Sequence, residues 1–302
     1  MSHQTNFITY LKLLLMALFW GGTFIAGRLL AGEVSPFSAA FLRFAIASAV
    51  LVLISLRNYR TLPKVQGNQW IPLLILGFSG VFAYNAFFFK GLELVEAGRA
   101  AVIIANNPIF IGLFAALLFK EELNFQKIAG IILSISGAII VITKGQPLTI
   151  FFTGLGKGEL LIFGCVISWT IYSLAGRAAM RGFTPLVAVT YSALIGTLLL
   201  FPAAYFEGLF QHISRYSATA WGCLLYLGLC GTVLGFVWYY QGIQKIGSTR
   251  ASQFINFVPV SAVLLSVWLL NEPLTISLLF GLLFVSSGVY LTNRSTILRL
   301  GD

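Results

Sequence analysis

Apolar residues run along almost the whole chain in long stretches, separated by short breaks of charged or turn-forming residues. Most stretches approach or exceed the roughly 18 to 20 residues that an α-helix needs to cross a bilayer. The pattern therefore predicts an all-α polytopic membrane protein. The ten predicted spans are 11–31, 37–57, 70–89, 98–119, 125–143, 158–178, 186–206, 220–243, 250–270 and 275–293.

The second half of the chain repeats the landmarks of the first half. FWGGTFIAGR at 19–28 and SWTIYSLAGR at 168–177 share a Trp and an Ala-Gly-Arg ending, 149 positions apart. Other pairs keep a distance of 149 or 151 positions: Pro36 and Pro185, Gly91 and Gly242, Arg99 and Arg250, Pro108 and Pro259, Glu121 and Glu272, Gly130 and Gly281, Gly137 and Gly288. So many matches in one order indicate a duplicated unit of about 150 residues. We expect a first five-helix repeat at 1–148 and a second at 149–302.

Each unit contains five predicted spans, and this odd number makes the second unit enter the membrane from the opposite side. The chain is thus predicted to hold two inverted repeats. Such repeats are typical of secondary transporters, in which two similar halves exchange inward-open and outward-open conformations around a central site. The sequence therefore predicts transport by alternating access.

Two equivalent segments carry a family resemblance. Residues 90–108 read KGLELVEAGRAAVIIANNP, and residues 241–259 read QGIQKIGSTRASQFINFVP. With the spans that follow them, and with the aromatic-glycine segment ending in Arg28, they resemble the EamA repeat of the drug/metabolite transporter superfamily. The resemblance covers essentially the whole chain and implies a ten-helix transporter, often an exporter of amino acids or other small metabolites, with its cavity between the two halves. We expect it in the cytoplasmic (inner) membrane of a bacterium.

The charges are few and unevenly placed. Only 9% of the residues are charged, against about 25% in ordinary soluble domains. With a cytoplasmic N-terminus, twelve Lys and Arg lie on the cytoplasmic side and six outside, while Arg43 lies within a span. This bias follows the positive-inside rule and predicts that both termini are cytoplasmic. It accounts for the net charge of +10 without a nucleic-acid partner. The expected partners are a small-molecule substrate and membrane lipid.

The fourth helix of each repeat contains a proline in its predicted interior, Pro108 and Pro259. A proline there removes a backbone hydrogen bond, so a kink is expected to face protein or a water-filled cavity. Amide side chains lie beside both prolines: Asn106, Asn107, Gln253 and Asn256. We predict that some of these amides line the cavity and bind substrate. The alternative is that they join helices to one another.

Aromatic residues form a second candidate set. Trp20 and Trp169 occupy equivalent positions well inside their spans, whereas Trp residues that anchor a helix belong at the membrane interface. Thr23 and Tyr172 follow them by one helical turn and share their faces. An aromatic wall with a few polar groups suits a zwitterion with a side chain, or a heterocycle. The remaining candidates for the cavity are Tyr84, Asn85, Trp238 and Tyr239.

Arg43 is the one cation clearly inside a predicted span, and its equivalent in the second repeat is Ser192. A charge within the membrane is a functional candidate by default. We therefore include Arg43 as an anchor for a substrate carboxylate or as a gating residue. The alternative is that its long side chain reaches the lipid headgroups from about two turns inside the helix.

Several absences argue against an enzyme. The string Gly-Phe-Ser-Gly at 77–80 fits a pattern of intramembrane serine proteases, but neither His3 nor His212 lies deep in a span to activate Ser79. A GxxxxGK[ST] phosphate-binding motif is missing, so direct use of ATP is not expected. We expect no catalysis, no cofactor and no metal site. Carboxylates are also missing from the span centres, which favours facilitated diffusion or exchange over proton coupling.

The charge balance of the spans narrows the substrate class. Nucleotide-sugars and phosphorylated metabolites are anionic and would need several cations, whereas a cationic drug would need a buried carboxylate. Neutral or zwitterionic metabolites fit best, with amino acid export as the leading hypothesis. The alternatives are another solute class, such as nucleobases, nucleosides, nucleotide-sugars or drug-like compounds, and a channel or non-transporting scaffold. The glycines spaced by seven in the last helix of each repeat predict either close helix packing or a homodimer surface.

Overall fold

The computed structural model describes residues 3–107, 109–111, 113–114, 125–146, 155–179, 182–246 and 254–297. Elements named α are α-helices, and elements named η are 3-10 or π-helices. The elements are α1 (His3–Leu30), α2 (Pro36–Tyr59), η1 (Gly67–Gln69), α3 (Trp70–Leu76), η2 (Gly77–Ala83), α4 (Tyr84–Leu92), α5 (Ala97–Ile104), α7 (Phe125–Ile142), α9 (Lys157–Ala179), α10 (Pro185–Phe206), α11 (Leu209–His212), η4 (Ile213–Arg215), α12 (Ala218–Tyr226), η5 (Leu227–Leu234), α13 (Gly235–Ile246), η6 (Phe254–Asn256), α15 (Phe257–Leu270) and α16 (Ile276–Ile297).

The described helices account for all ten predicted spans. Seven helical stretches are long and apolar enough to cross a membrane. Three shorter apolar helices, Ala97–Ile111, Phe254–Leu270 and Ile276–Leu291, lie where the fourth, ninth and tenth spans were predicted. The prediction of an all-α membrane fold with ten spanning helices is confirmed.

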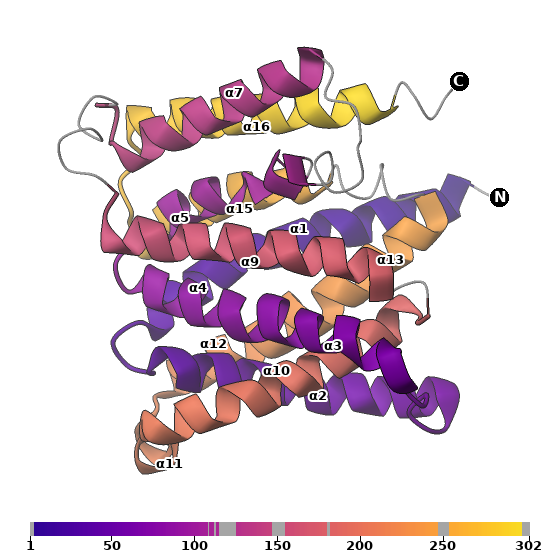
Figure 1. Ribbon diagram of the computed structural model, residues 1–302. Coiled ribbons are helices and arrows are strands. Elements are labelled where there is room, and N and C mark those ends of the chain that lie inside the picture. The colour runs from indigo at the N-terminus through magenta and orange to yellow at the C-terminus, as the bar shows by residue number, and fades with distance from the viewer. Residues whose placement is uncertain are drawn as a thin grey trace.

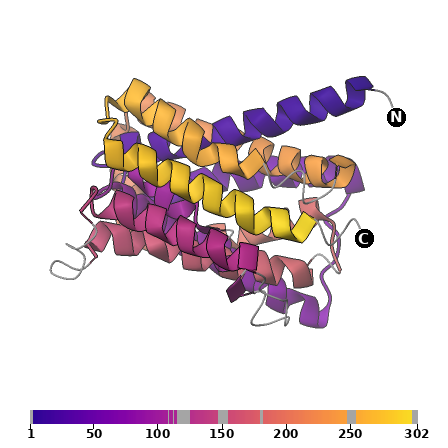
Figure 2. The same cartoon turned by 90° about the horizontal axis from the view of Figure 1, so that it is seen from above.

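The helices run roughly side by side in a bundle (Figure 1). The pair α7 and α16 forms one edge of the bundle, and α2 with α10 forms the opposite edge. Viewed from above, α16 lies beside α7 across the top of the bundle (Figure 2). The helix α1 begins, and α16 ends, at the same end of the molecule. We call the opposite end, where α1 ends and α2 begins, the distal end.

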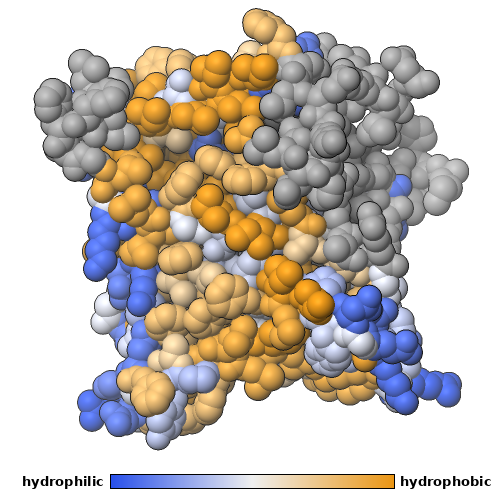
Figure 3. Space-filling view, viewed as in Figure 1, coloured by the Kyte–Doolittle hydropathy of each residue, from blue (hydrophilic) through white to orange (hydrophobic). Residues whose placement is uncertain are grey.

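The surface has the distribution of polarity that a bilayer requires. Apolar side chains cover the middle of the face shown in Figure 3, and hydrophilic residues gather towards the two ends of the helices. Many large apolar side chains on the spans are exposed, among them Leu198 and Trp268. These side chains lie on the outside of the spanning helices, so in a bilayer they would face the lipid chains.

Each repeat packs largely against the other repeat. The first helix of the first half, α1, packs on α13 and α15, while its counterpart α9 packs on α4 and α5. Equivalent glycines allow these close approaches. A Cβ on Gly91 would lie 2.5 Å from Ile162 Cδ1, and a Cβ on Gly242 would lie 2.7 Å from Leu13 Cδ2. Leu13 and Ile162 are themselves 149 positions apart, so the same contact is made twice with the roles of the halves exchanged.

The glycines spaced by seven pack α7 against α16 within this chain. A Cβ on Gly137 would lie 2.8 Å from the Gly281 carbonyl oxygen, and a Cβ on Gly288 would lie 2.5 Å from the Gly130 carbonyl oxygen. Small residues permit such contact between helix backbones. The close-packing interpretation therefore accounts for this motif, and a homodimer remains a prediction.

The third span of each repeat contains a π-helix at the equivalent place. In the first repeat η2 lies between α3 and α4, and in the second repeat η5 lies between α12 and α13. Each π-helix packs on the second helix of the other repeat: a Cβ on Gly77 would lie 2.5 Å from Ile195 Cγ2, and one on Gly228 would lie 2.8 Å from Ile46 Cγ2. Single π-helical turns inside α-helices occur frequently at functional sites.

Candidate functional site

Arg43 lies on α2 and is buried, with 7% of its surface exposed. Its Nε donates a hydrogen bond to Thr232 Oγ1 at 3.1 Å, and its Nη1 donates to Asn85 Oδ1 at 3.0 Å. Thr232 belongs to η5 of the second repeat, whereas Asn85 belongs to α4 of the first. The guanidinium is therefore held between the two halves, and the prediction that it lies inside the membrane region agrees with its placement in Pro36–Tyr59.

Both partners of Arg43 are themselves fixed by backbone carbonyl groups. Asn85 Nδ2 donates to the Val81 carbonyl oxygen at 2.8 Å, which turns Oδ1 towards the guanidinium. Thr232 Oγ1 donates to the Leu227 carbonyl oxygen at 2.9 Å, five residues earlier. Both carbonyl groups belong to the π-helical segments. The two π-helices thus orient the groups that hold Arg43.

The partners of Arg43 are neutral. Among the residues that the structure describes, one ion pair is present, between Arg99 and Glu159, and no carboxylate pairs with Arg43. The Phe44 ring is a further neighbour, and its centroid lies 5.3 Å from Arg43 Cζ. A desolvated cation without an anion is costly, so such a residue in a membrane protein is a candidate for a functional site. The contacts of Arg43 thus leave its guanidinium without an anionic partner.

A cluster of aromatic rings lies beside Arg43 and spans both repeats. Trp169 contacts Tyr84, Tyr172 and Phe236 at centroid distances of 5.5, 5.1 and 6.2 Å. Phe236 also contacts Trp20 at 5.5 Å. Tyr84 immediately precedes Asn85, which accepts the hydrogen bond from Arg43 Nη1. We call this set the aromatic cluster, and its members are Trp20, Tyr84, Trp169, Tyr172, Phe236 and Tyr239.

Gly231 of η5 connects the aromatic cluster with Arg43. Trp20 Nε1 donates to the Gly231 carbonyl oxygen at 2.9 Å. A Cβ at Gly231 would lie 2.6 Å from Thr23 Cγ2 and 3.9 Å from Arg43 Nη2. Thr23 is buried, and its hydroxyl donates to the Trp20 carbonyl oxygen at 2.6 Å. Only glycine lets α1 approach η5 closely enough to make these contacts.

The two adjacent asparagines of the fourth span, Asn106 and Asn107, differ in their hydrogen bonds. Asn106 is buried, its Nδ2 donates to the carbonyl oxygens of Val102 and Ile103, and its Oδ1 accepts from Ser134 Oγ at 2.8 Å. These bonds favour the helix-joining interpretation for Asn106. Asn107 Oδ1, in contrast, is buried and has no hydrogen-bond partner. A buried acceptor without a donor is costly, so Asn107 is the better candidate for a substrate contact.

The remaining candidates are placed as follows. Asn256 is half-buried at the end of η6, immediately before α15. Trp238 stacks on Phe19 at 5.6 Å and contacts none of the rings of the aromatic cluster among the described ring pairs. Pro108 and Gln253 lie outside the described residues.

Pro259 requires a correction. The sequence predicted a proline inside the helix, but Pro259 is the third residue of α15. Its missing N–H costs nothing in a first helical turn, where the N–H groups have no helical acceptor. The irregular backbone lies before the proline, in the 3-10 helix η6.

The sequence analysis missed Thr232, Gly231 and Phe236. A signal was available, because GFSG at 77–80 and GLCG at 228–231 are 151 positions apart and each lies within a π-helical segment. The hydroxyl of Ser79, in GFSG, already makes a hydrogen bond: its Oγ donates to the Ile75 carbonyl oxygen at 2.7 Å. It borders an apolar pocket of about 310 Å³ that Ile75, Phe78 and Ile171 help to line. These surroundings offer Ser79 no base.

The comparisons with known proteins agree with this architecture. The model of the EamA-like transporter family matches residues 7–143 and again residues 156–294. The uncharacterized transporter YyaM of Bacillus subtilis (strain 168) is 30% identical over 280 residues, covering 93% of this chain and 92% of YyaM. An uncharacterized transporter of Archaeoglobus fulgidus is 30% identical over 287 residues, covering 95% of this chain and 98% of its own.

A solved crystal structure shares the fold. It has 22% sequence identity and a TM-score of 0.64, and the match covers 94% of this chain and 97% of the other. The two family matches together span nearly the whole chain, one on each side of its middle. This chain therefore belongs to the EamA-like transporter family.

Proposed function

We propose that this protein exports small neutral or zwitterionic metabolites that bear a carboxylate, amino acids foremost, by alternating access of its two repeats. Its family membership makes it a membrane transporter. The substrate, the direction and the mechanism are the proposed parts. We place it in the bacterial inner membrane with both termini cytoplasmic, in accordance with the distribution of Lys and Arg.

The observation that carries this proposal is the buried guanidinium of Arg43 with only neutral partners. A carboxylate entering beside it would supply the missing anion, and charge-assisted hydrogen bonds of this kind are about twice as strong as neutral ones. A single cation suits one carboxylate and not a di- or triphosphate. The substrate's own ammonium group would keep the solute neutral overall.

The aromatic cluster supports the rest of the assignment. Its rings adjoin Arg43 and come from α1, α4, α9 and α13, which belong to both repeats. Apolar walls with a few convergent polar groups are typical of small-molecule sites. A movement of one repeat relative to the other would change these contacts, as alternating access requires. The same rings would also accept a nucleobase, which is the second candidate substrate class.

Uptake into proteoliposomes tests this proposal. The purified protein would be offered labelled amino acids, nucleobases and sugars, with and without unlabelled solute inside. We expect saturable uptake of amino acids or related carboxylates that preloading accelerates. Uptake of nucleobases alone would favour the second candidate. Uptake of nothing by folded protein would contradict transport of these solutes, and open-pore conductance would indicate a channel.

The adjacent pair Asn107 and Asn106 allows a matched test of the amide assignment. Asn107→Ala is expected to lower transport per folded molecule by about 10-fold or more, because a hydrogen bond to a charged group contributes about 1.5–3 kcal/mol. Its thermal stability should be unchanged. Asn106→Ala removes the bond from Ser134 and should lower thermal stability while transport per folded molecule is kept. Transport loss with Asn106→Ala alone would reverse the assignment.

A further inference from the structure

Four glutamates at the distal end each join one repeat to the other. They are Glu33 of the first repeat and Glu159, Glu207 and Glu272 of the second. Each makes its hydrogen bonds to the opposite repeat rather than within its own. We call these four residues the glutamate latch.

Glu207 follows α10 and binds the first turn of α2. Its Oε2 accepts from the backbone N–H groups of Phe37 and Ser38 at 2.9 and 3.0 Å. A carboxylate is favourable there because the first N–H groups of a helix have no helical acceptors and carry partial positive charge. Burial raises the pKa of Glu207, and the two N–H groups and Lys90 counteract this shift. The helix that Glu207 binds, α2, also contains Arg43, about two turns after Pro36.

Glu272 makes the equivalent bond to the fourth span. Its two oxygens accept from the N–H groups of Ala97 and Gly98 at 2.8 and 3.0 Å, at the start of α5. Glu33 binds the start of α12, where it accepts from the backbone N–H of Ser217 and from Ser217 Oγ at 3.0 Å. Each of these carboxylates therefore binds the N-terminal end of a helix in the other half.

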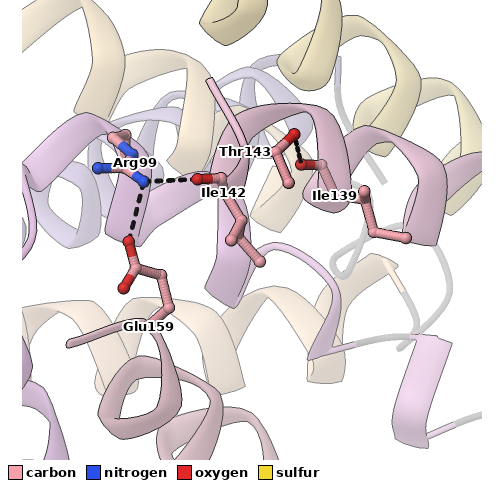
Figure 4. A network of polar contacts seen from close by, with 5 residues as sticks. All are labelled: Arg99, Ile139, Ile142, Thr143 and Glu159. Carbon is pink, nitrogen blue, oxygen red and sulfur yellow. Dashed lines mark hydrogen bonds and ion pairs between the residues drawn. The ribbon is translucent and has the colours of Figure 1, made fainter. Parts of the chain in front are cut away.

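Glu159 uses a side-chain partner. Its Oε1 lies 2.9 Å from Arg99 Nη2, and the same nitrogen donates to the Ile142 carbonyl oxygen at the end of α7 (Figure 4). The three helices α5, α7 and α9 are thus tied together at one point. Both side chains are largely shielded from water, with 14% exposed in each. An ion pair with so little exposure is screened less by salt than a surface pair.

Apolar packing closes the distal end beneath these bonds. Leu30, Val34, Leu92 and Val95 are at most 3% exposed and belong to the main core cluster. The start of α9 presses on this layer, since a Cβ at Gly158 would lie 2.6 Å from Val95 Cγ2. A solute beside Arg43 cannot leave through this end unless the repeats separate here.

We propose that the glutamate latch is the gate of the distal end, and that each transport cycle breaks and reforms its contacts between the repeats. This inference rests on the alternating-access part of the proposed function. A carboxylate bond to a helix N-terminus suits a gate because water can replace its partners once the ends separate. The apolar layer supplies the seal, and the latch sets how often the seal opens.

The native Cys165 reports on the gate without any substrate. It is fully buried between the repeats, and its Sγ lies 3.5 Å from the Tyr84 carbonyl oxygen. Replacing Cys223 and Cys230 with alanine leaves it as the only thiol. A charged, water-soluble maleimide would then be applied to this protein in nanodiscs. Its reaction rate measures how often α4 and α9 part.

Glu159→Gln combined with Glu272→Gln is expected to raise the labelling rate of Cys165 on the order of tenfold, because each change weakens a charge-assisted contact. Glu93→Gln is the matched control, since Glu93 is an exposed glutamate at the same end. It should leave the rate unchanged, and Cys165→Ala should abolish labelling. An unchanged rate in the double variant, in protein that stays monodisperse, would overturn the latch.

A disulfide tests the other half of the proposal. A Cβ at Gly98 would lie 2.9 Å from Ser266 Oγ, so Gly98→Cys with Ser266→Cys brings two sulfurs within bonding reach across the repeats. In a background without the native cysteines, oxidation should reduce transport to the level of empty liposomes, and reductant should restore it. Transport that continues with the disulfide formed would show that this end need not open. Because maleimide labelling uses no substrate, a failed substrate panel would leave the gate result intact.

Discussion

Replacing Arg43 with methionine is expected to reduce transport of carboxylate-bearing solutes by about 100-fold or more. Removing one partner of a buried, hydrogen-bonded charge pair costs about 2–5 kcal/mol of binding free energy. A loss of about 2.7 kcal/mol corresponds to about 100-fold in affinity. The stability should not fall in parallel. Methionine removes the desolvation cost of a buried cation, and this gain offsets the loss of the donor to Asn85 Oδ1, which on its own costs about 1–3 kcal/mol. Counterflow in proteoliposomes and thermal unfolding of the same preparation measure both effects.

Arg57→Met is the matched control for this experiment. Arg57 lies in the last turn of α2 and is exposed, so its loss removes a cation from the same helix without touching the site. Transport by this variant should match the parent. Arg43→Lys keeps the charge but not the planar pair of donors, and should recover only part of the activity. Full transport by Arg43→Met would rule out a carboxylate anchor at this position.

Replacing Gly288 with alanine is expected to lower the free energy of unfolding by about 2–3 kcal/mol, a large cost for one methyl group. The new Cβ would lie 2.5 Å from the Gly130 carbonyl oxygen and 2.6 Å from the Ser134 backbone nitrogen. Both are backbone atoms of α7, so no side chain can turn away to relieve the overlap. The two helices must separate along their contact, which loses packing over their length.

Gly222→Ala provides the contrasting glycine. A Cβ at Gly222, in α12, meets nothing within 4 Å. Alanine is favoured over glycine in a helix by about 1 kcal/mol, so this variant should be as stable as the parent or slightly more stable. Thermal unfolding of both variants in one detergent makes the comparison. Equal stability of the two would mean that α7 and α16 can adjust to the added methyl group.

The hydrophobic pattern predicted the fold well because a bilayer imposes one simple rule on every span. An apolar stretch of sufficient length must become a helix in the bilayer, so the number and order of the spans follow from where the apolar stretches lie along the chain. The backbone irregularities do not. The π-helix η2 keeps the apolar character of its neighbours, and the 3-10 helix η6 moves the break of its span ahead of Pro259.

The candidate site was predictable in part. Arg43 and Trp20 were chosen as candidates because a charge, or a Trp, deep in a span is unusual on its own. The partners of Arg43 are ordinary residues that gain a role only from tertiary packing, and Thr232 lies 189 positions away. The two adjacent asparagines of the fourth span likewise could not be told apart from the sequence. Nothing in the sequence distinguishes Asn106 from Asn107, and only the contact with Ser134 assigns one of them to helix packing.

The interlocked packing of the two halves also affects how the protein is made. Gly21 and Gly22 of α1 fit against Ser261 and Tyr226, whose hydroxyls donate to backbone carbonyls of α1 across 244 and 207 positions. The ribosome therefore delivers α1 to the bilayer long before its neighbours exist. Until the second half is inserted, lipid must cover a helix face shaped for protein. A chain that stopped after its first repeat would present this unfilled face to the membrane and to the machinery that removes incomplete proteins.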